Sequence, residues 1–383
     1  MKWNKDKTSY ILCALLVAFA LFAPSLIGPQ VNRDRYQEWI EPTPPVWQGQ
    51  LSLWAVSGFP VGQNTLGGWV RERVREFEKA AFGVYVDVRA MRFEEAKAAL
   101  SAGEKPDVIV FPTGFFDSPD MLLPLDAPSG LNAALANSGK EGAKTYALPV
   151  MSGAYVLAVN EELGILAGVM PPEDIGYGPP EIARMAGAEG GSLCADETDY
   201  SNPSLAFAYA LAEDGEAAVK ALERTRGAGI FYSGNGLLCL GNQNTAATAR
   251  SNYENGEGFS CAFWALSGFT DMVQYVGVVS GQPAAKAEIC AQLARSFVSE
   301  EAQRSVKGIA MFPVLQGGEP LYEDDQRFWA AEQAFVRDTA APPCFGYARV
   351  RARWEEWLQK AARGDKEALK SLVRDMRATC KQG

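Results

Sequence analysis

The side chains best suited to chemistry in this sequence are aromatic and small polar residues, because the chain has no histidine. The absence excludes Ser-His-Asp and Cys-His catalytic groups and any histidine metal ligand. Trp54 and Ser57 stand at the end of the apolar run 50–56, and Thr113 and Phe115 follow a second run, 106–111. Ligands bind outside the carboxyl ends of strands in open α/β sheets, so these residues are candidates for a binding site.

Alternating strand and helix patterns position these residues. Residues 50–56, 84–91 and 106–111 have the composition of strands, and residues 69–81 and 93–103 have helical periodicity between them. This βαβαβ order predicts an α/β domain with a parallel sheet. The β-type run 146–160 is interrupted by Pro149 and Gly153, and it could cross into a second domain. Further helices are expected at 203–226, 290–306, 349–362 and 366–376, and an irregular segment is expected at 168–202.

Length and charge limit the partners. The 383 residues are enough for about two domains. The chain has 46 acidic and 36 basic side chains, for a net charge of -10. Nucleic acid is therefore excluded as a partner, because phosphate binding needs clustered Lys and Arg.

The N-terminal segment predicts export. Lys2, Lys5 and Lys7 precede an uncharged stretch at 8–32 whose apolar part, 10–28, nearly spans a bilayer. The lysines predict a cytoplasmic N-terminus, with the bulk of the chain outside the cytoplasm, at the cell surface or in the periplasm. The segment is either a cleaved signal peptide or an uncleaved signal anchor. Because Pro24 follows the one plausible cleavage site, we expect a membrane anchor at 1–32 and a Pro-rich stalk at 33–46.

The cysteines leave two interpretations open. Beyond the N-terminal segment, six cysteines are widely and irregularly spaced, and no C-x-x-C motif occurs. Disulfides are possible in an exported chain, but buried free thiols fit the spacing as well. We expect no metal site and no cofactor.

Signatures of an enzyme are missing. The sequence lacks the phosphate-binding loop, the dinucleotide-binding glycine motif, S-x-x-K and H-E-x-x-H. A pair of carboxylates for glycoside hydrolysis could come from Asp117, Asp120 or Asp126, but these residues suit a solvated loop better. We therefore predict that the chain is not an enzyme.

Several segments together resemble the extracellular solute-binding proteins of ABC transporters, in particular the maltose-binding-protein-like, sugar-binding group. These segments are LSLWAVSG at 51–58, VREFEKA at 74–80, VYVDVRA at 84–90, AGEKPDVIVF at 102–111 and LLPLD at 122–126. The run TYALPVMSGAYVLAVNEELG at 145–164 is similar to the first crossing between lobes in that family, through Tyr146, Pro149, Tyr155 and Asn160. FTDMVQYVGVV at 269–279 resembles the return to the first lobe, and ARSFVSEEAQRSVKGIAMFPV at 294–314 resembles the segment before the third crossing.

The resemblance implies a type II periplasmic-binding-protein-like fold with two discontinuous lobes. Lobe 1 would comprise 47–150 and 262–312, and lobe 2 would comprise 151–261 and 313–383. Such a protein closes its lobes on a small-molecule ligand, here an oligosaccharide, and as a monomer delivers it to ABC permease subunits. The segment 191–199 matches nothing in the family pattern, and the apparent anchor also departs from it.

A sugar-binding cleft needs aromatic rings for C–H faces and polar groups for hydroxyls. Core packing remains the alternative for each aromatic. The expected ligand is neutral, because no Arg or Lys stands at the candidate strand ends. The expected binding residues are Trp54, Ser57, Thr113, Phe115, Tyr155, Tyr232, Asn235, Trp264 and Phe312.

Two other functions remain open. A membrane-anchored sensor or assembly protein could keep the binding fold without transport, and an anchored hydrolase could use the same cleft.

Overall fold

The apolar runs near residues 50, 84 and 106 form neighbouring parallel strands of one sheet. The computed structural model describes residues 47–167, 182, 185–186, 193–211, 215–325, 328, 331–333 and 338–382. The first sheet has the order β2-β1-β3-β12-β6, in which β1 is parallel to β2 and β3, and β12 is antiparallel to β3 and β6. The bounds of its strands are β1 (Gly49–Ser57), β2 (Val84–Arg92), β3 (Val108–Pro112), β6 (Leu148–Ser152) and β12 (Val273–Val278). The predicted βαβαβ order is confirmed.

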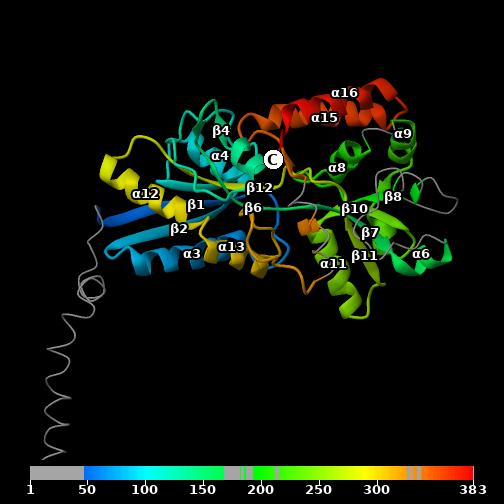
Figure 1. Cartoon of the computed structure of the whole chain (residues 1–383), viewed down its shortest axis with the longest axis horizontal. Coiled ribbons are helices and arrows are strands. Elements are labelled where there is room, and N and C mark those ends of the chain that lie inside the picture. The colour runs from blue at the N-terminus through cyan, green and yellow to red at the C-terminus, as the bar shows by residue number, and fades with distance from the viewer. Residues whose placement is uncertain are drawn as a thin grey trace, which may run out of the picture.

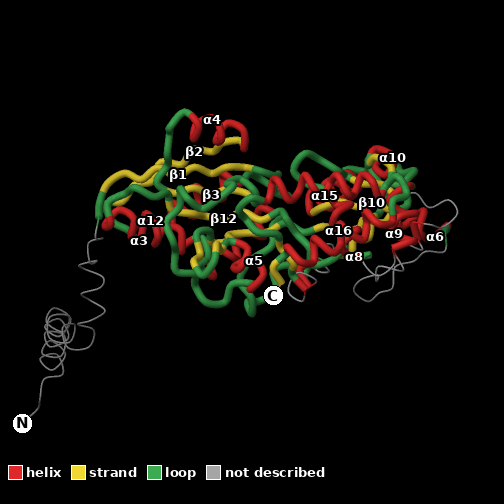
Figure 2. Tube along the Cα trace, turned by 90° about the horizontal axis from the view of Figure 1, so that it is seen from above, coloured by secondary structure: helices red, strands yellow, loops and turns green. Residues whose placement is uncertain are grey.

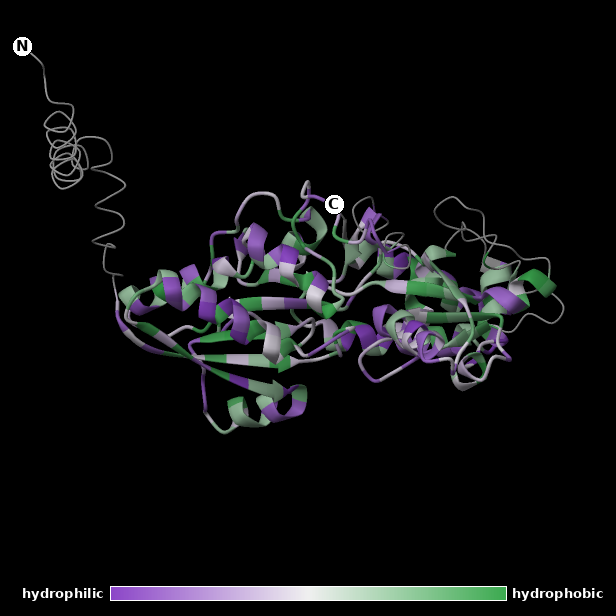
Figure 3. Cartoon of the chain, turned by 90° about the horizontal axis from the view of Figure 1, so that it is seen from below, coloured by the Kyte–Doolittle hydropathy of each residue, from purple (hydrophilic) through white to green (hydrophobic). Residues whose placement is uncertain are grey.

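Helices cover this sheet with their apolar faces. In α3 (Leu66–Ala80) the residues Trp69, Val70 and Val74 are buried, and Thr65 caps the first turn by accepting a hydrogen bond from the Gly68 amide. Figure 3 shows hydrophobic residues along the strands and more hydrophilic residues on the surrounding helices. The other helices of this lobe are α4 (Phe93–Ser101), α5 (Ala133–Ser138), α12 (Ala284–Ser296), α13 (Glu300–Ser305) and the 3₁₀ helix η1 (Val306–Ile309). The short strands β4 (Lys140–Glu141) and β5 (Lys144–Thr145) pair with each other.

A second sheet forms the other lobe, and Figure 1 shows the two lobes side by side. Its order is β11-β7-β10-β8-β9, with β7 antiparallel to β10 and β11, and β8 parallel to β10 and β9. Its strands are β7 (Tyr155–Asn160), β8 (Leu193–Ala195), β9 (Arg226–Gly227), β10 (Leu238–Asn242) and β11 (Cys261–Ala265). Its helices are α6 (Glu161–Leu166), α8 (Pro203–Ala210), α9 (Gly215–Glu223), α10 (Gly229–Tyr232) and α11 (Gln243–Glu254).

The chain passes between the two sheets in one region, which we call the waist, where the crossings lie next to each other. The first crossing joins β6 to β7, as expected for the interrupted run 146–160, and the second joins β11 to β12. At Gly153 the two crossings meet, because its amide donates to the Met272 carbonyl at 2.7 Å and a Cβ would lie 3.0 Å from Met272. Ser152 also exchanges two backbone hydrogen bonds with Phe312, at 3.0 and 2.8 Å. Three stretches far apart in sequence therefore lie together at the waist.

The chain ends in two amphipathic helices, α15 (Tyr347–Ala361) and α16 (Lys366–Thr379), close to where the sequence predicts them. Both pack against α8 and α9 of the second lobe, and Figure 2 shows them on that side of the molecule. The short strands β13 (Ala340–Ala341) and β14 (Lys381–Gln382) pair beside α5, so the C-terminal region contacts both lobes.

Several local expectations need correction. The helix expected at 203–226 is two helices, α8 and α9. The helix expected at 290–306 starts earlier, at Ala284, and ends at Ser296, because Ser299 caps a new helix, α13. Within the segment expected to be irregular, 168–202, the described part contains strand β8.

The pairing of strands also bears on the expected lobes. Met151 and Ser152 belong to β6 of the first sheet, although the expected boundary placed them in lobe 2. Residues 262–265 belong to β11 of the second sheet, although the expected boundary placed them in lobe 1. Away from these strands, the division into lobes stays a prediction.

The expected anchor and stalk at 1–46 lie outside the described residues. Among the residues that the structure describes, no helix is long and apolar enough to cross a membrane. Cys239, Cys261, Cys290, Cys344 and Cys380 are free thiols.

Candidate ligand-binding cleft

A cavity of about 500 Å³ lies between the two lobes at the waist, and we call it the interlobe cavity. The first lobe contributes the residues after β1, the start of α4 and the end of β3: Gly58, Phe59, Phe93, Glu94, Pro112, Thr113 and Gly114. The other side comes from the loop between β8 and α8, the second crossing and α15: Asp199, Tyr200, Asp271, Tyr347, Ala348, Arg351, Ala352 and Glu355. The cavity thus lies at the carboxyl ends of β1 and β3, where the sheet order predicts a ligand site.

Glycines bring the two strand ends of the first lobe together. A Cβ on Gly58 would lie 2.3 Å from the Pro112 Cγ atom, so only glycine allows this approach. Gly114 has a φ of +77° and donates its amide to the Cys344 carbonyl at 2.9 Å. The two glycines therefore let the ends of β1 and β3 and the chain before α15 pack closely at this wall.

A buried carboxylate links the crossings to α15. Asp271, in the second crossing, is 6 % exposed. Its Oδ1 accepts from the Tyr155 hydroxyl at 2.7 Å, and its Oδ2 accepts from the Tyr347 hydroxyl at 2.6 Å. The Tyr155 hydroxyl in turn accepts from the Asn202 amide at 3.2 Å. Burial, and then the charge of Asp271, raise the pKa of Tyr155 and Tyr347 well above the usual value, so both tyrosines stay neutral donors.

Arg351 adds a cation beside this carboxylate. Its Nε atom donates to the Glu355 Oε1 atom at 2.8 Å, one turn along α15. Burial is the largest single influence and acts to lower the pKa of Arg351, but Asp271, Tyr347 and the hydrogen bond to Glu355 together outweigh it, so the pKa is raised and the guanidinium stays charged.

The interlobe cavity is acidic on balance. Four carboxylates line it, from Glu94, Asp199, Asp271 and Glu355. The one basic side chain among its lining residues is Arg351. Among the described residues, no group of three or more His, Cys, Asp and Glu side chains is arranged to hold a metal ion. Because four carboxylates face one guanidinium, an anionic ligand would be repelled from this cavity.

A second cavity, of about 520 Å³, opens between α15 and the β8–β9 edge of the second sheet. We call it the lobe 2 cavity. Its lining includes Asp196, Glu197, Asn202 and Arg226, and it shares Glu355 with the interlobe cavity. Asp196 is held in place, because its Oδ2 accepts from the Thr245 hydroxyl at 2.8 Å and from the Tyr232 hydroxyl at 3.0 Å.

The structure separates the nine expected binding residues. Among them, Thr113 lines the interlobe cavity, where its hydroxyl also donates to the Val273 carbonyl at 3.3 Å. Tyr155 and Tyr232 are one hydrogen bond from cavity walls, through Asp271 and Asp196.

The other expected residues lie elsewhere. Trp54 is 5 % exposed in the middle of β1, paired with Arg89 and Ile109, and Phe115 is fully buried among other phenylalanines. Trp264 is buried in β11. Ser57 and Asn235 are exposed and bond locally, to the Phe59 carbonyl and to Ser233.

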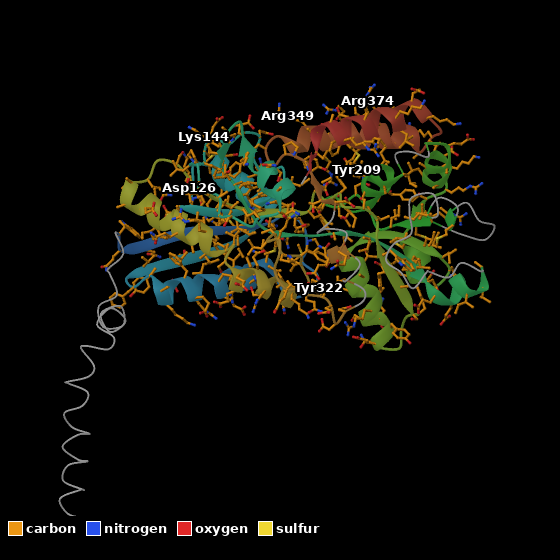
Figure 4. The ribbon with its side chains drawn as sticks, in the orientation of Figure 1. Asp126, Lys144, Tyr209, Tyr322, Arg349 and Arg374 are labelled. Carbon is orange, nitrogen blue, oxygen red and sulfur yellow. The ribbon has the colours of Figure 1, made fainter. Side chains whose placement is uncertain are left out.

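Phe312 lines a different cavity, of about 200 Å³, beside residues 313–321. It packs against Tyr322 and Phe328. Figure 4 shows Tyr322 at the opposite edge of the waist from Arg349, which is in the first turn of α15. The site expected from sequence is therefore spread over the core and over more than one cavity.

The charged residues of the interlobe cavity include two that lie away from strand ends. Asp271 is in the second crossing, and Arg351 is on the C-terminal helix α15. One signal was present: residues 347, 351 and 355 recur every four positions, which places Tyr347, Arg351 and Glu355 on one face of a helix. For Asp199 and Tyr200, in the segment 191–199 and just after it, we found no signal.

The comparisons bear on the fold. No protein-family model matches the sequence, and no curated protein matches it. Among solved structures, a cyclic α-maltosyl-1,6-maltose binding protein from Arthrobacter globiformis superposes with a TM-score of 0.65 at 14% identity, covering 87% of this chain and 99% of that one. An ABC substrate-binding protein from Listeria monocytogenes in complex with cycloalternan gives 0.60 at 14% identity, with the same coverage.

The sugar-binding protein MalE from Xanthomonas citri gives a TM-score of 0.60 at 15% identity, covering 86% of this chain and 97% of that one. At these identities the likeness shows architecture, and it extends over nearly the whole length of each of these proteins. The chain therefore has the two-lobed α/β fold of the ABC substrate-binding proteins that it resembles.

Proposed function

We propose that the protein is an extracytoplasmic solute-binding protein that captures an oligosaccharide between its two lobes for an ABC importer. The observation that carries the proposal is the interlobe cavity, to which both lobes and the second crossing contribute. A ligand in that cavity would contact both lobes fully only when they are closed, so binding would shift the molecule toward the closed state. The structural neighbours whose descriptions name sugars support a carbohydrate as ligand.

The cavity offers the groups that a sugar needs. Phe59, Phe93 and Tyr200 provide aromatic surface, and Thr113 provides a hydroxyl group. Its volume of about 500 Å³ is within the range of small-molecule sites. We propose Phe93, Thr113 and Tyr200 as ligand contacts in place of the buried Trp54.

Binding and turnover separate this function from a hydrolase. The full-length protein is titrated calorimetrically with a panel of tetrasaccharides, and the sugars are analysed afterwards by mass spectrometry. Binding of at least one unmodified tetrasaccharide is expected. Cleavage products would favour a hydrolase, and no binding by any sugar in the panel would contradict the proposal.

Delivery to a permease and anchoring by residues 1–32 belong to the same proposal. The uncharged run 8–32 and Pro24 support retention of the N-terminal segment. N-terminal sequencing of the protein from the membrane fraction is expected to give the intact start. A sequence that begins near residue 24 or 29 would contradict anchoring, while leaving the binding function intact.

A further inference from the structure

The interlobe cavity and the lobe 2 cavity meet at one junction. Glu355 lines both of them. The loop 196–202 between β8 and α8 also faces both, since Asp196, Glu197 and Asn202 line one cavity and Asp199 and Tyr200 line the other. A ligand longer than one sugar unit that fills the interlobe cavity would reach this junction.

Carboxylates outnumber cations at the junction. Asp196, Glu197, Asp199 and Glu355 come from the loop and from α15, while Arg226 and Arg351 are the basic residues that line the two cavities. The Arg351 guanidinium already donates to Glu355, so it neutralises a carboxylate of the junction itself. A negative charge therefore remains over the loop.

The loop also has acceptor capacity that the protein does not use. Asn202 is 9 % exposed and lines the lobe 2 cavity, and its Oδ1 atom has no hydrogen-bond partner among the described residues. The hydroxyl oxygen of Thr198, four residues earlier, is buried and has no partner there either. An unpartnered buried polar atom costs about 1–3 kcal/mol, so a ligand donor that reached the Asn202 Oδ1 atom after a side-chain movement would recover part of that cost.

Negative charge and free acceptors match one chemical group. A protonated amine has three N–H donors, no acceptor and a positive charge. A neutral hydroxyl also donates to a carboxylate, but it has one donor and no positive charge. A carboxylate or phosphate is repelled by the negative charge.

We propose that the carbohydrate ligand carries a protonated amine, and that this amine binds at the junction between Glu355 and the loop 196–202. The inference rests on the proposed oligosaccharide-binding function and adds the substrate class: amino sugars. The sugar rings occupy the interlobe cavity, and the amine selects the ligand from neutral sugars of the same length.

Two matched pairs of probes test the amine. The β-1,4-linked tetramers of glucosamine and glucose differ only in amine and hydroxyl, and so do 6-amino-6-deoxymaltotetraose and maltotetraose in the α-1,4 series. In at least one series, calorimetry on the full-length protein at low salt should give about tenfold tighter binding for the amine. This preference should shrink when the salt concentration rises from about 0.02 M to about 0.5 M, because salt screens the attraction.

Variants locate the amine. Asp199 and Glu197 are exposed, and glutamine keeps an acceptor for the Ser204 hydroxyl that donates to Glu197 at 2.6 Å, so Asp199→Asn and Glu197→Gln should leave the core intact. Each should weaken binding of the amine about threefold and the double variant about tenfold, with little change for the neutral partner. Glu162→Gln is the control, because Glu162 is an exposed acid of the same lobe on α6, outside both cavities.

The outcomes separate the two proposals. If the neutral tetramer binds as tightly as its amine partner in both series, or if the double variant keeps the amine preference, the amino-sugar inference is wrong while oligosaccharide binding stands. If none of the four probes binds, both proposals fall.

Discussion

The two lobes contribute to the cleft in different ways. On the first lobe, the wall is formed by the ends of β1 and β3, where Gly58 and Gly114 allow the backbone to approach closely. On the second lobe, the wall comes from the loop 196–202 and from α15, and it carries most of the charge. The first lobe thus provides aromatic and hydroxyl groups at its strand ends, and the second lobe provides most of the charge.

Truncation of Trp54 should have the largest effect, and it should act on stability alone. Trp54 is buried in β1, and the Arg89 guanidinium lies 5.8 Å from the centre of its ring. Trp54→Ala should lower the free energy of unfolding by about 3–5 kcal/mol, as for other large core truncations. Urea unfolding gives this value, and calorimetry on the folded fraction should give an unchanged ligand affinity.

Trp54→Phe serves as the control, since it keeps an aromatic ring and should cost less. If Trp54→Ala lost much of its ligand affinity while its stability stayed normal, Trp54 would belong to the binding site, and the contrast drawn between the two lobes would be wrong.

Asp271 tests the waist, where the lobes meet. Asp271→Ala would leave the hydroxyls of Tyr155 and Tyr347 buried without their acceptor, and it should cost about 2–4 kcal/mol of unfolding free energy. Adding Tyr155→Phe and Tyr347→Phe should recover part of the loss, because no unpaired hydroxyl then remains. Thermal unfolding of the wild type, Asp271→Ala and the triple variant measures this. A triple variant less stable than Asp271→Ala would contradict the hydrogen bonds from the two tyrosines to Asp271.

Tyr200 tests the second lobe. It is half-buried in the loop 196–202 and lines the interlobe cavity. Tyr200→Ala should weaken ligand binding about tenfold, or about 1.4 kcal/mol, and should change the unfolding free energy by less than about 0.5 kcal/mol. Tyr253→Ala is the control, because Tyr253 is an exposed tyrosine on α11 of the same lobe that does not line the cavity. Equal affinity for the two variants would contradict the assignment of this loop to the site.

The contrast between lobes also explains what the sequence could predict. In the first lobe, short apolar runs separated by clear helical periodicity make β1, β2, β3 and the crossing β6–β7 recognisable. In the second lobe, β8 has three residues and β9 has two, which is too short for a period-2 pattern. Helix α8 is apolar on all sides, so its end could not be read from an amphipathic pattern.

The site was harder to predict because its members are brought together by the fold. The apolar run 50–56 places Trp54 near the end of a predicted strand, but β1 continues to Ser57 and the cavity begins at Gly58 and Phe59. Asp271 and Arg351 lie 80 positions apart and meet only because the second crossing and α15 both reach the waist. Such neighbours depend on tertiary contacts, which no local pattern of residues records.

The smallest predicted effect is on the pH dependence of the unfolding free energy, and it tests whether the two lobes unfold together. Cys290 is on α12 of the first lobe and Cys261 is on β11 of the second, and burial raises the pKa of each thiol to about 12. In the unfolded chain a thiol has a pKa of about 8.5. Between these values the folded state holds a proton that the unfolded state has lost, so stability is fully present below about pH 8.5 and falls as the pH rises toward 12.

Cys261→Ala and Cys290→Ala should each make this decline shallower, by about 1 kcal/mol between about pH 8 and about pH 9.3. The measurement is urea unfolding at several pH values, with the slope on pH compared among the wild type and both variants. If the lobes unfold as one unit, the two variants should flatten the slope of the same single transition. Two transitions, each sensitive to one cysteine, would instead show that the lobes are independent in stability as well as different in their contributions to the cleft.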